Sequence, residues 1–590
     1  AAKMMKAAKT AKTVKAGSKL TTAGKLLRGS AKLGLAGFTG YSAWQNIEQA
    51  GNLYAQGEYI KAARCLVNAA GGAVALTSAR RCKSNISAVE TADDLAKQAN
   101  KNARRIRHRP KRKTFRNKNP KHVKCDPEFG EPVDAVTGEV VAHQQDFSIQ
   151  GRIPIAWGRH YGSQNQRIGL CGRGWETPAD ARLELNSDGT VVFHHGNGIA
   201  SYFSRLPGKS PVTEPVDGGI LARTDRHYTL RLKEGLVYHF PLVPPQTKEI
   251  KVELITDLSG NSWQFVREQD GLKEIRESTG RRLRITSADG LIRRIELILP
   301  YHDPRLLVRY EYDQDKNLTA VYDALGAPYR FAYEKNLLVQ HTDRNGLSFN
   351  YKYDKYGPGG RCVHSWGDGK LYDYRFVYRT EERVTEITDS LGNVSYLKYD
   401  ESQMVVEEVD ALGGVIRYEY DDEGRTTAVI DQDGRRTEYG YDRYGNLVSL
   451  IRPDGQKLTV TYDTEHRPVA ITDFDGTCWR QEWDDCGRLV KRISPLGMEF
   501  RYEYDEFGQP VGFIDPAGAK TTLEFDKWGN PVRLSDALGH STELAYDVLG
   551  RVTERLEPLN RRTVFMYDQK GRLVRVKKPD GSELCYAYDA

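Results

Sequence analysis

The sequence predicts a mainly β protein made of antiparallel β-hairpins, with a short helical region at its N-terminus. From Cys125 onward, short β-like runs alternate with Gly, Asp and Asn, and helical periodicity is lost. One residue pattern also recurs in this part at a constant interval, which is typical of repeat proteins. The composition agrees, because 590 residues with 28% charged side chains and 55 Gly are typical of a water-exposed chain that is rich in turns.

The repeat is defined by an aromatic residue followed by Asp, which recurs every 21 residues in the final part of the chain. A register of Gly lies between these pairs at the same interval. From Gly424 onward, a further register of Gly follows the pairs and is broken only by His466. The predicted structural repeat positions are Tyr399, Tyr420, Tyr441, Tyr462, Trp483, Tyr504, Phe525, Tyr546, Tyr567, Gly413, Gly434, Gly455 and Gly476.

A single repeat explains the interval. Tyr439 and Tyr441 fall on one face of a strand by period-two alternation, and residues 447–451 form the returning strand. Asp442 begins a tight turn and Gly445 ends it, as Asp and Gly do at the first and fourth positions of such turns. Two strands and two turns therefore account for the 21 residues.

The aromatic side chains are the expected core of this array. Burial of about 200 Å² per aromatic residue, at roughly 25 cal/mol per Å², contributes on the order of 5 kcal/mol per repeat as an upper bound. The alternative is a ladder of exposed Tyr that grips sugars.

The N-terminal part differs in charge and periodicity. Residues 1–80 are rich in Ala, Gly, Lys and Leu and predict helix, whereas residues 81–124 form a basic linker. Residues 1–124 carry 27 Lys and Arg against 5 Asp and Glu, or +22, and the remainder carries 60 against 74, or −14. The basic run could also bind an anionic partner or serve as a processing site. The sequence shows neither a membrane-spanning stretch nor a cleavable signal.

No residue is assigned a catalytic role. The eight Cys show no C-x-x-C pair, and a zinc site or disulfide framework is not expected. His194 and His195 are neighbours on a β-like run, so they point to opposite faces and cannot easily share a metal; surface or turn roles are expected. Asp-rich stretches such as 473–476 are interpreted as turns and not as calcium loops.

The string Y-x-Y-D-x-x-G-R-L resembles the YD repeat of the Rhs family, which is shared with teneurins and the C components of bacterial Tc toxins. It is represented at 418–425 and 567–573. A second resemblance is to the domain that precedes the repeats in bacterial Rhs proteins, an arrangement that teneurins lack. It rests on Pro132–Glu139, Phe147, Arg159-His160-Tyr161 and Gly174-Trp175.

The resemblance and the composition together divide the chain into five regions. These are the helical region 1–80, the basic linker 81–124, a pre-repeat β domain 125–205, diverged β repeats 206–380 and regular repeats 381–590.

The resemblance implies a hollow shell, wound from a spiral of hairpins, that encloses a C-terminal toxin domain beyond this chain. The protein would be a bacterial polymorphic toxin, delivered to other cells as a type VI secretion effector, and this chain its N-terminal and shell portion. Expected partners are the toxin domain, its immunity protein, and a secretion chaperone and spike protein that bind residues 1–124; nucleic acid is not expected. The protein would be made in the bacterial cytoplasm and secreted, or displayed on the cell surface.

Two other functions stay open. A surface adhesin would bind carbohydrate or protein through the YD repeats, and a secretion signal or anchor in the gene would favour it. An enzyme acting on polysaccharide would need paired carboxylates in a cleft. As a shell portion, the chain is expected not to be an enzyme and to hold no cofactor and no metal.

Overall fold

The computed structural model describes residues 127–588, apart from 245, 270 and 300–302. The predicted helical region 1–80 and basic linker 81–124 lie outside the described residues. The described part is mainly β, as the sequence predicts, and its helices are the short 3-10 turns η4 (Pro178–Asp180), η5 (Asp368–Lys370) and η6 (Pro558–Asn560). Within that part, no helix combines the length and the apolar character that crossing a membrane requires.

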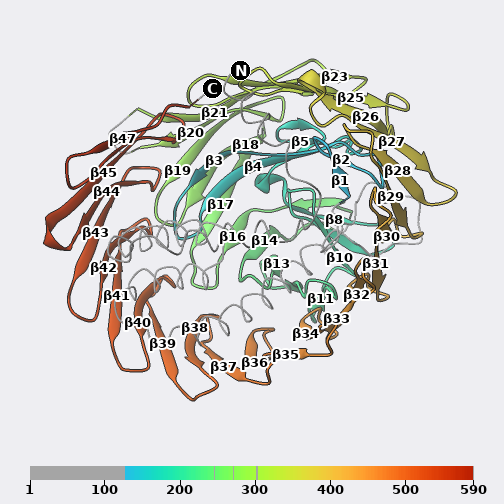
Figure 1. Cartoon of the computed structure of the whole chain (residues 1–590). Coiled ribbons are helices and arrows are strands. Elements are labelled where there is room, and N and C mark those ends of the chain that lie inside the picture. The colour runs from blue at the N-terminus through green and yellow to red at the C-terminus, as the bar shows by residue number, and fades with distance from the viewer. Residues whose placement is uncertain (1–126, 245, 270, 300–302, 589–590) are drawn as a thin grey trace, which may run out of the picture.

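One antiparallel sheet of 36 strands dominates the structure (Figure 1). Each strand pairs with the next, and the order departs from the sequence only at β15. Its earlier strands are β11 (Val212–Thr213), β12 (Ile220–Arg223), β13 (His227–Arg231), β14 (Val237–Pro241), β16 (Leu254–Thr256), β17 (Ser262–Glu268), β18 (Gly271–Glu277), β19 (Arg282–Ala288), β20 (Leu291–Ile298), β21 (Arg305–Tyr312), β22 (Leu318–Tyr322), β23 (Pro328–Glu334), β24 (Leu337–Thr342), β25 (Ser348–Tyr353), β26 (Cys362–Gly367), β27 (Tyr374–Arg379) and β28 (Val384–Thr388).

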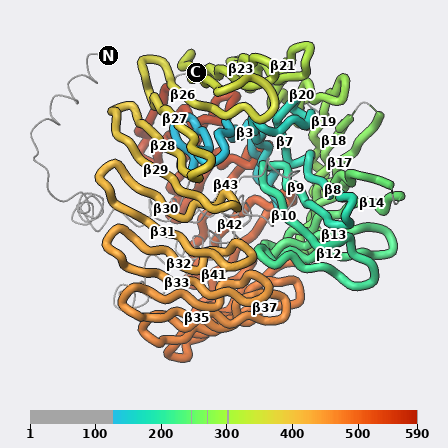
Figure 2. The backbone as a smooth tube through the Cα atoms, turned by 90° about the vertical axis from the view of Figure 1, so that its right-hand side faces the viewer, coloured from blue at the N-terminus to red at the C-terminus, as the bar shows by residue number. Residues whose placement is uncertain are grey.

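The regular repeats continue this sheet without a break, and Figure 2 shows their hairpins side by side. Their strands are β29 (Val394–Tyr399), β30 (Val405–Val409), β31 (Val415–Tyr420), β32 (Thr426–Ile430), β33 (Arg436–Tyr441), β34 (Leu447–Ile451), β35 (Lys457–Tyr462), β36 (Pro468–Thr472), β37 (Cys478–Trp483), β38 (Leu489–Ile493), β39 (Glu499–Tyr504), β40 (Pro510–Ile514), β41 (Lys520–Phe525), β42 (Pro531–Ser535), β43 (Ser541–Tyr546), β44 (Val552–Glu557), β45 (Arg561–Tyr567), β46 (Leu573–Lys577) and β47 (Glu583–Cys585).

Residues 127–205, here called the cap, form small separate sheets that lie inside the curve of the large sheet (Figure 1). The strand β15, which follows later in the sequence, completes one of them by pairing with β8. These strands are β1 (Glu128–Phe129), β2 (Val133–Asp134), β3 (Val141–Ile149), β4 (Ile155–Gly162), β5 (Ile168–Gly169), β6 (Gly172–Arg173), β7 (Trp175–Glu176), β8 (Arg182–Leu185), β9 (Val191–His194), β10 (Ala200–Phe203) and β15 (Glu249–Lys251).

Each repeat departs from strict strand alternation at one place. A register shift lies between Gly440 and Tyr441, and the same shift precedes Tyr462 and Tyr504. Such a bulge inserts one residue and turns the strand locally. Tyr439 is buried and Tyr441 only half-buried against the core, so the simple alternation expected for this pair ends just before the turn.

The hairpin turns form two rims of the sheet. The YD rim holds the turns after each Y-x-Y-D, such as 442–445, and the leucine rim holds the turns at the other ends of the strands, such as 452–455. The sheet winds round until its later YD rim, residues 421–571, meets the leucine rim of its earlier strands, residues 214–326. This contact is called the seam. There Lys233 Nζ donates a hydrogen bond to Tyr444 O at 2.9 Å, and Asn261 Nδ2 donates one to Phe507 O at 2.8 Å.

Two glycines with similar backbone angles test the seam. Gly445 has a φ of +72° and Gly455 a φ of +82°, which L-residues rarely adopt. A Cβ on Gly445 would overlap the carbonyl oxygen of Val216 across the seam, whereas a Cβ on Gly455 has no described atom within 4 Å. We expect Gly455→Ala to cost about 1–2 kcal/mol from the backbone alone and Gly445→Ala clearly more. Urea unfolding, combined with hydrogen exchange at residues 214–219, measures the loss of stability in each variant. Equal losses in the two variants would exclude close contact at the seam.

Candidate functional site: the inner face, its cap and the seam

The first aromatic residue of each Y-x-Y-D pattern marks the inner face of the sheet. Trp157 Nε1 of the cap donates to Tyr310 Oη at 3.0 Å, and Trp175 packs edge-on against Phe331 with ring centroids 5.2 Å apart. Further along the sheet, this register again holds buried apolar side chains, interrupted by Gln481 and by the half-buried Tyr502: Tyr351, Phe376, Leu397, Tyr418, Tyr439, Val460, Leu523, Leu544 and Phe565. The inner face is therefore mainly apolar, and the charged residues Glu408, Arg492 and Arg555 also lie on it, opposite Leu397, Gln481 and Leu544.

The opposite, outer face carries charged pairs between neighbouring strands. Lys398 Nζ lies 2.5 Å from Glu407 Oε1, and Arg417 Nε lies 3.0 Å from Glu407 Oε2. Arg436 of β33 reaches across β32 and lies 2.6 Å from Glu419 of β31. Cross-strand pairs of opposite charge stabilise a sheet modestly and keep its surface hydrated. The two faces thus differ in polarity all along the repeats.

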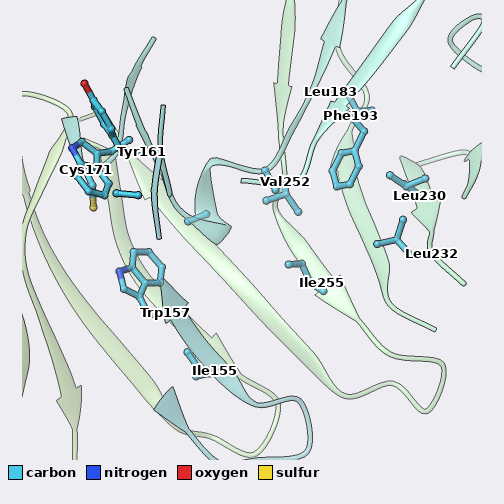
Figure 3. Close-up of a cluster of buried hydrophobic side chains, with 14 of the residues drawn as sticks. Ile155, Trp157, Tyr161, Cys171, Leu183, Phe193, Leu230, Leu232, Val252 and Ile255 are labelled. Atoms are coloured by element: carbon cyan, nitrogen blue, oxygen red, sulfur yellow. The ribbon is translucent and has the colours of Figure 1, made fainter. Parts of the chain in front are cut away.

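The cap covers both the inner face and the YD rim of the earlier strands. Its core continues into that of the sheet, from Trp157 and Phe193 to Leu230 and Ile255 (Figure 3). Main-chain hydrogen bonds also join the cap to the sheet. Cys362 N donates to Gly138 O at 2.8 Å, Arg173 N to Lys316 O at 3.0 Å, and Ile292 N to Leu170 O at 2.8 Å. The cap is therefore fixed to the sheet by packing and by hydrogen bonds.

A buried ion pair lies beneath this contact. The side chains of Arg159 and Asp146 are 0% and 3% exposed, and Arg159 Nε lies 2.7 Å from Asp146 Oδ2. Tyr310 Oη donates to the same carboxylate at 2.6 Å. Burial and the adjacent carboxylate raise the pKa of Tyr310 well above its ordinary value, so the hydroxyl stays protonated and donates. The ion pair joins β3 to β4 of the cap, and the Tyr310 hydroxyl connects it to β21.

Five of the predicted aromatic positions make the same link between hairpins. The hydroxyl donates to a main-chain carbonyl 15 residues earlier in Tyr420, Tyr462, Tyr504, Tyr546 and Tyr567, at 2.6 to 3.0 Å. Trp483 makes the link with its indole N–H at 2.7 Å. Tyr399 is buried, Tyr441 packs against the core, and Phe525 has no hydroxyl to donate. Six of the nine predicted aromatic side chains therefore join their hairpin to the preceding one.

The predicted glycines lie on the leucine rim. Gly413, Gly434, Gly455 and Gly476 have φ values of +84°, +77°, +82° and +82°. For these four, no described atom comes within 4 Å of an added Cβ. They are needed for the backbone of the turn and not for close packing.

Sequence reasoning missed the role of the Arg that follows many YD turns. In Arg425, Nε lies 2.7 Å from its own turn carboxylate, Asp421, and Nη1 donates to Asp442 O of the next repeat at 2.8 Å. Arg467 and Arg488 repeat both contacts. The recurrence of Arg four residues after Asp was a usable signal, because this spacing places the side chain over its own turn.

His466 stands in the seam where other repeats have Gly. Asn446 Nδ2 lies 3.1 Å from His466 Nδ1, and the Tyr444 ring centroid lies 4.5 Å away. Across the seam, Arg231 lies 2.5 Å from Glu465. Burial, and after it the charge of Lys233, lowers the pKa of His466. The neutral imidazole is therefore favoured in the folded chain.

The paired histidines are buried, and the surface roles expected for them are wrong. His194 ends β9, which is buried along its length, and His195 follows it; they are 7% and 9% exposed. His194 Nε2 lies 2.6 Å from Glu184 Oε2, whereas His195 Nε2 lies 2.8 Å from Ser201 Oγ. Their partners differ, as expected for neighbours on a strand. Across the described ranges, no group of three or more His, Cys, Asp or Glu has the arrangement of a metal site.

These features define a repeat protein whose single curled sheet has an apolar inner face and an internal cap. Residues 130–203 match a family described as a domain of unknown function, DUF6531. Six segments between 420 and 583 match the RHS Repeat: 420–457, 443–477, 462–497, 504–541, 525–562 and 546–583. These matches, with the relatives below, confirm the resemblance to the Rhs, or YD-repeat, family seen in the sequence.

Two curated relatives are toxins. The chain is 30% identical over 282 residues to "Double-stranded DNA deaminase toxin A" of Burkholderia cenocepacia, covering 46% of this chain and 20% of that protein. It is 28% identical over 324 residues to "Toxin protein Tse5" of Pseudomonas aeruginosa, covering 47% and 24%. The matched part is thus about a fifth to a quarter of the length of these relatives.

Among solved structures, the chain matches the Tc holotoxin pore of Photorhabdus luminescens. The sequence identity is 12%, the match covers 72% of this chain and 26% of that one, and the TM-score is 0.35. A TM-score of this size does not establish a shared overall shape.

The buried ion pair gives a first prediction for the site. Arg159→Ala leaves the Asp146 carboxylate buried without its cation, so we expect a loss of about 3–5 kcal/mol in the unfolding of the cap. The matched control is Arg417→Ala on the outer face, where the side chain is 56% exposed and surface pairs are worth about 0–1 kcal/mol. Urea denaturation measures both variants. Equal losses would contradict a structural role for the buried pair.

A second prediction concerns pH at the seam. Because the folded chain lowers the pKa of His466, the stability that the neutral ring contributes is present above about pH 6.5 and is lost as the pH falls. Hydrogen exchange at the seam amides, corrected for intrinsic rates, should be faster at pH 5 than at pH 7. His466→Gly, which suits the φ of +65° at this position, should reduce that difference. An unchanged difference would assign the pH dependence to other groups.

Proposed function

We propose that this chain is the containment portion of an Rhs-type toxin. Its curled sheet is the wall of a hollow shell that encloses a toxin segment until delivery. The observation that carries the proposal is the polarity of the wall, whose inner face from Tyr351 to Phe565 is mainly apolar and whose outer face carries ion pairs. Burial of this inner register holds the hairpins together as a wall, while the charged outer face stays in contact with water.

The seam and the cap support containment. The seam brings successive windings of the sheet together, so that the wall has few open edges. The cap covers the inner face at the beginning of the sheet through contacts such as Trp157 with Tyr310. The names of the two curated relatives support a toxin, and most of the length of each relative lies outside the matched part.

The chain itself is proposed to be catalytically silent. Its polar side chains recur with the turns of the repeats, whereas an active site needs a few unique groups that converge on one place. The harmful activity would belong to the enclosed toxin domain, and an immunity protein would protect the producing cell. We further propose secretion through a type VI system, with residues 1–124 engaging a chaperone and a spike protein.

The outward ion pairs argue against the adhesin alternative. A sugar-binding surface of this kind would place the aromatic ladder outside, yet the first aromatic register faces the cap and the inner side. An adhesin could still bind through other surfaces of the sheet. The toxicity experiment below distinguishes this hypothesis from containment, because an adhesin would be non-toxic both as the complete product and as the shorter chain.

The proposed function is tested by expressing two forms in cells that lack an immunity protein. One is the product of the complete reading frame, and the other ends at Ala590. We expect growth inhibition from the complete product and none from the shorter chain, because the shorter chain holds only the container. Immunoblots control for equal expression. Equal toxicity of the two forms would place the harmful activity within these residues and contradict the proposal.

A further inference from the structure

One place on the inner face of the regular repeats replaces an apolar pair with a polar one. The preceding repeat has Val460 opposite Ile471 at this place, and both side chains are apolar. In the next repeat, Gln481 of β37 stands opposite Arg492 of β38. Trp479 lies on the same face of β37, two residues before Gln481, and pairs with Ile471. Trp479, Gln481 and Arg492 are here called the inner polar cluster.

The three side chains of the inner polar cluster are buried side by side. Trp479, Gln481 and Arg492 are 3%, 7% and 5% exposed. Arg492 Cζ lies 4.1 Å from the centroid of the Trp479 ring, within the range of a cation–π contact. This stacking holds the guanidinium beside the indole, so a positive charge has a defined position on a face that is otherwise mainly apolar.

Two polar atoms of the cluster have no hydrogen-bond partner in the described part of the chain. They are the indole Nε1 of Trp479, a donor, and the side-chain Oε1 of Gln481, an acceptor. Native structures leave few buried polar atoms in this condition, because each one costs free energy. Four other indole N–H groups of the described chain do donate a hydrogen bond, those of Trp157, Trp175, Trp263 and Trp483.

We infer that the inner polar cluster binds an aspartate or glutamate side chain of the enclosed polypeptide, an inference that rests on the proposed function. A carboxylate matches the cluster, because guanidinium and indole groups only donate hydrogen bonds. Gln481 Oε1 would accept a main-chain N–H of the same segment. Gln481 and Arg492 have long, flexible side chains, so rotation of their end groups presents them to the ligand without moving β37 or β38.

A segment of polypeptide fits the cluster better than a free anion. The segment supplies a carboxylate for Arg492 and Trp479 together with an N–H donor for Gln481, whereas an anion such as acetate supplies no donor. The location gives the second reason. The inner face is turned away from the solvent that surrounds the shell, so an enclosed ligand reaches it directly.

A second inner arginine provides a matched control. Arg555 occupies the same register position three repeats after Arg492 and stands opposite Leu544. It lies 3.4 Å from Glu557, a carboxylate of the wall itself. The two arginines therefore share their face and their place in the repeat, but Arg555 has an acidic partner on its own strand.

Photo-crosslinking identifies what contacts the cluster. Gln481→p-benzoylphenylalanine is placed in the product of the complete reading frame, which is made by cell-free translation because it is expected to be toxic. After irradiation, mass spectrometry identifies the crosslinked peptide. We expect one dominant peptide from beyond residue 590, with Asp or Glu at the crosslink. The same replacement of Leu523, two repeats further along the register, is the control and should reach a different peptide.

Removal of the charge then tests the contact. Arg492→Leu copies the apolar side chain of equivalent positions such as Leu450, so the wall should keep its fold. Hydrogen exchange of the crosslinked peptide should become at least about tenfold faster, because a charged hydrogen bond is lost. Arg555→Leu should leave that exchange unchanged, and Arg492→Lys should restore part of the protection. In the chain ending at Ala590, urea unfolding should be similar with and without Arg492→Leu.

Three results would overturn the inference. The first is crosslinking confined to residues 1–590. The second is an equal change in exchange of the crosslinked peptide in Arg492→Leu and Arg555→Leu. The third is calorimetric binding of acetate to the chain ending at Ala590, lost in Arg492→Leu, without a crosslink beyond residue 590, which would assign the cluster to a free anion. These readouts are independent of toxicity, so failure here is distinguishable from failure of the proposed function.

Discussion

A single antiparallel sheet with one apolar face has to shield that face from water without a second sheet to pack against. In this protein, curvature meets the constraint, because the inner register from Tyr310 to Phe565 is turned away from solvent while the ion pairs of the outer face stay hydrated. The cap supplies the packing partner at the beginning of the winding, through Trp157 and Trp175. The winding of the sheet also places its hairpin turns along two rims and brings these rims together at the seam.

Curvature would be lost if neighbouring hairpins could pivot, and the repeats prevent this by linking each hairpin to the next. The turn carboxylate of Asp421 accepts main-chain N–H groups of its own turn, and Arg425 joins that carboxylate to the main chain of the following turn. The hydroxyl of Tyr420 makes the link in the other direction, to Val405 O. Since every link reaches only the adjacent hairpin, stability along the array is a sum of local terms, as in other repeat proteins.

The local part of this design could be predicted from the sequence, because it depends on residues within one period. The turns around Asp442 and Gly445 and the return strand 447–451 follow from their spacing. The bulge before Tyr441 could not be foreseen, since period-two alternation has no signal for an inserted residue. The seam was out of reach for a different reason: Lys233 and Tyr444 are 211 residues apart, and their contact depends on the accumulated curvature of the whole sheet. The burial of His194 and His195 also depends on packing that the local pattern does not encode.

The two kinds of contact in the wall differ in strength. Within a winding, neighbouring strands share a ladder of main-chain hydrogen bonds, as between β33 and β34. Across the seam, the windings meet through turns, by side chains such as Lys233 and Asn261 that donate to single carbonyls. Parting two windings breaks a few such bonds, whereas parting two strands breaks a whole ladder. The windings are therefore expected to separate at the seam before neighbouring strands separate. His466 lies in the seam, so a titratable group stands at this weaker contact.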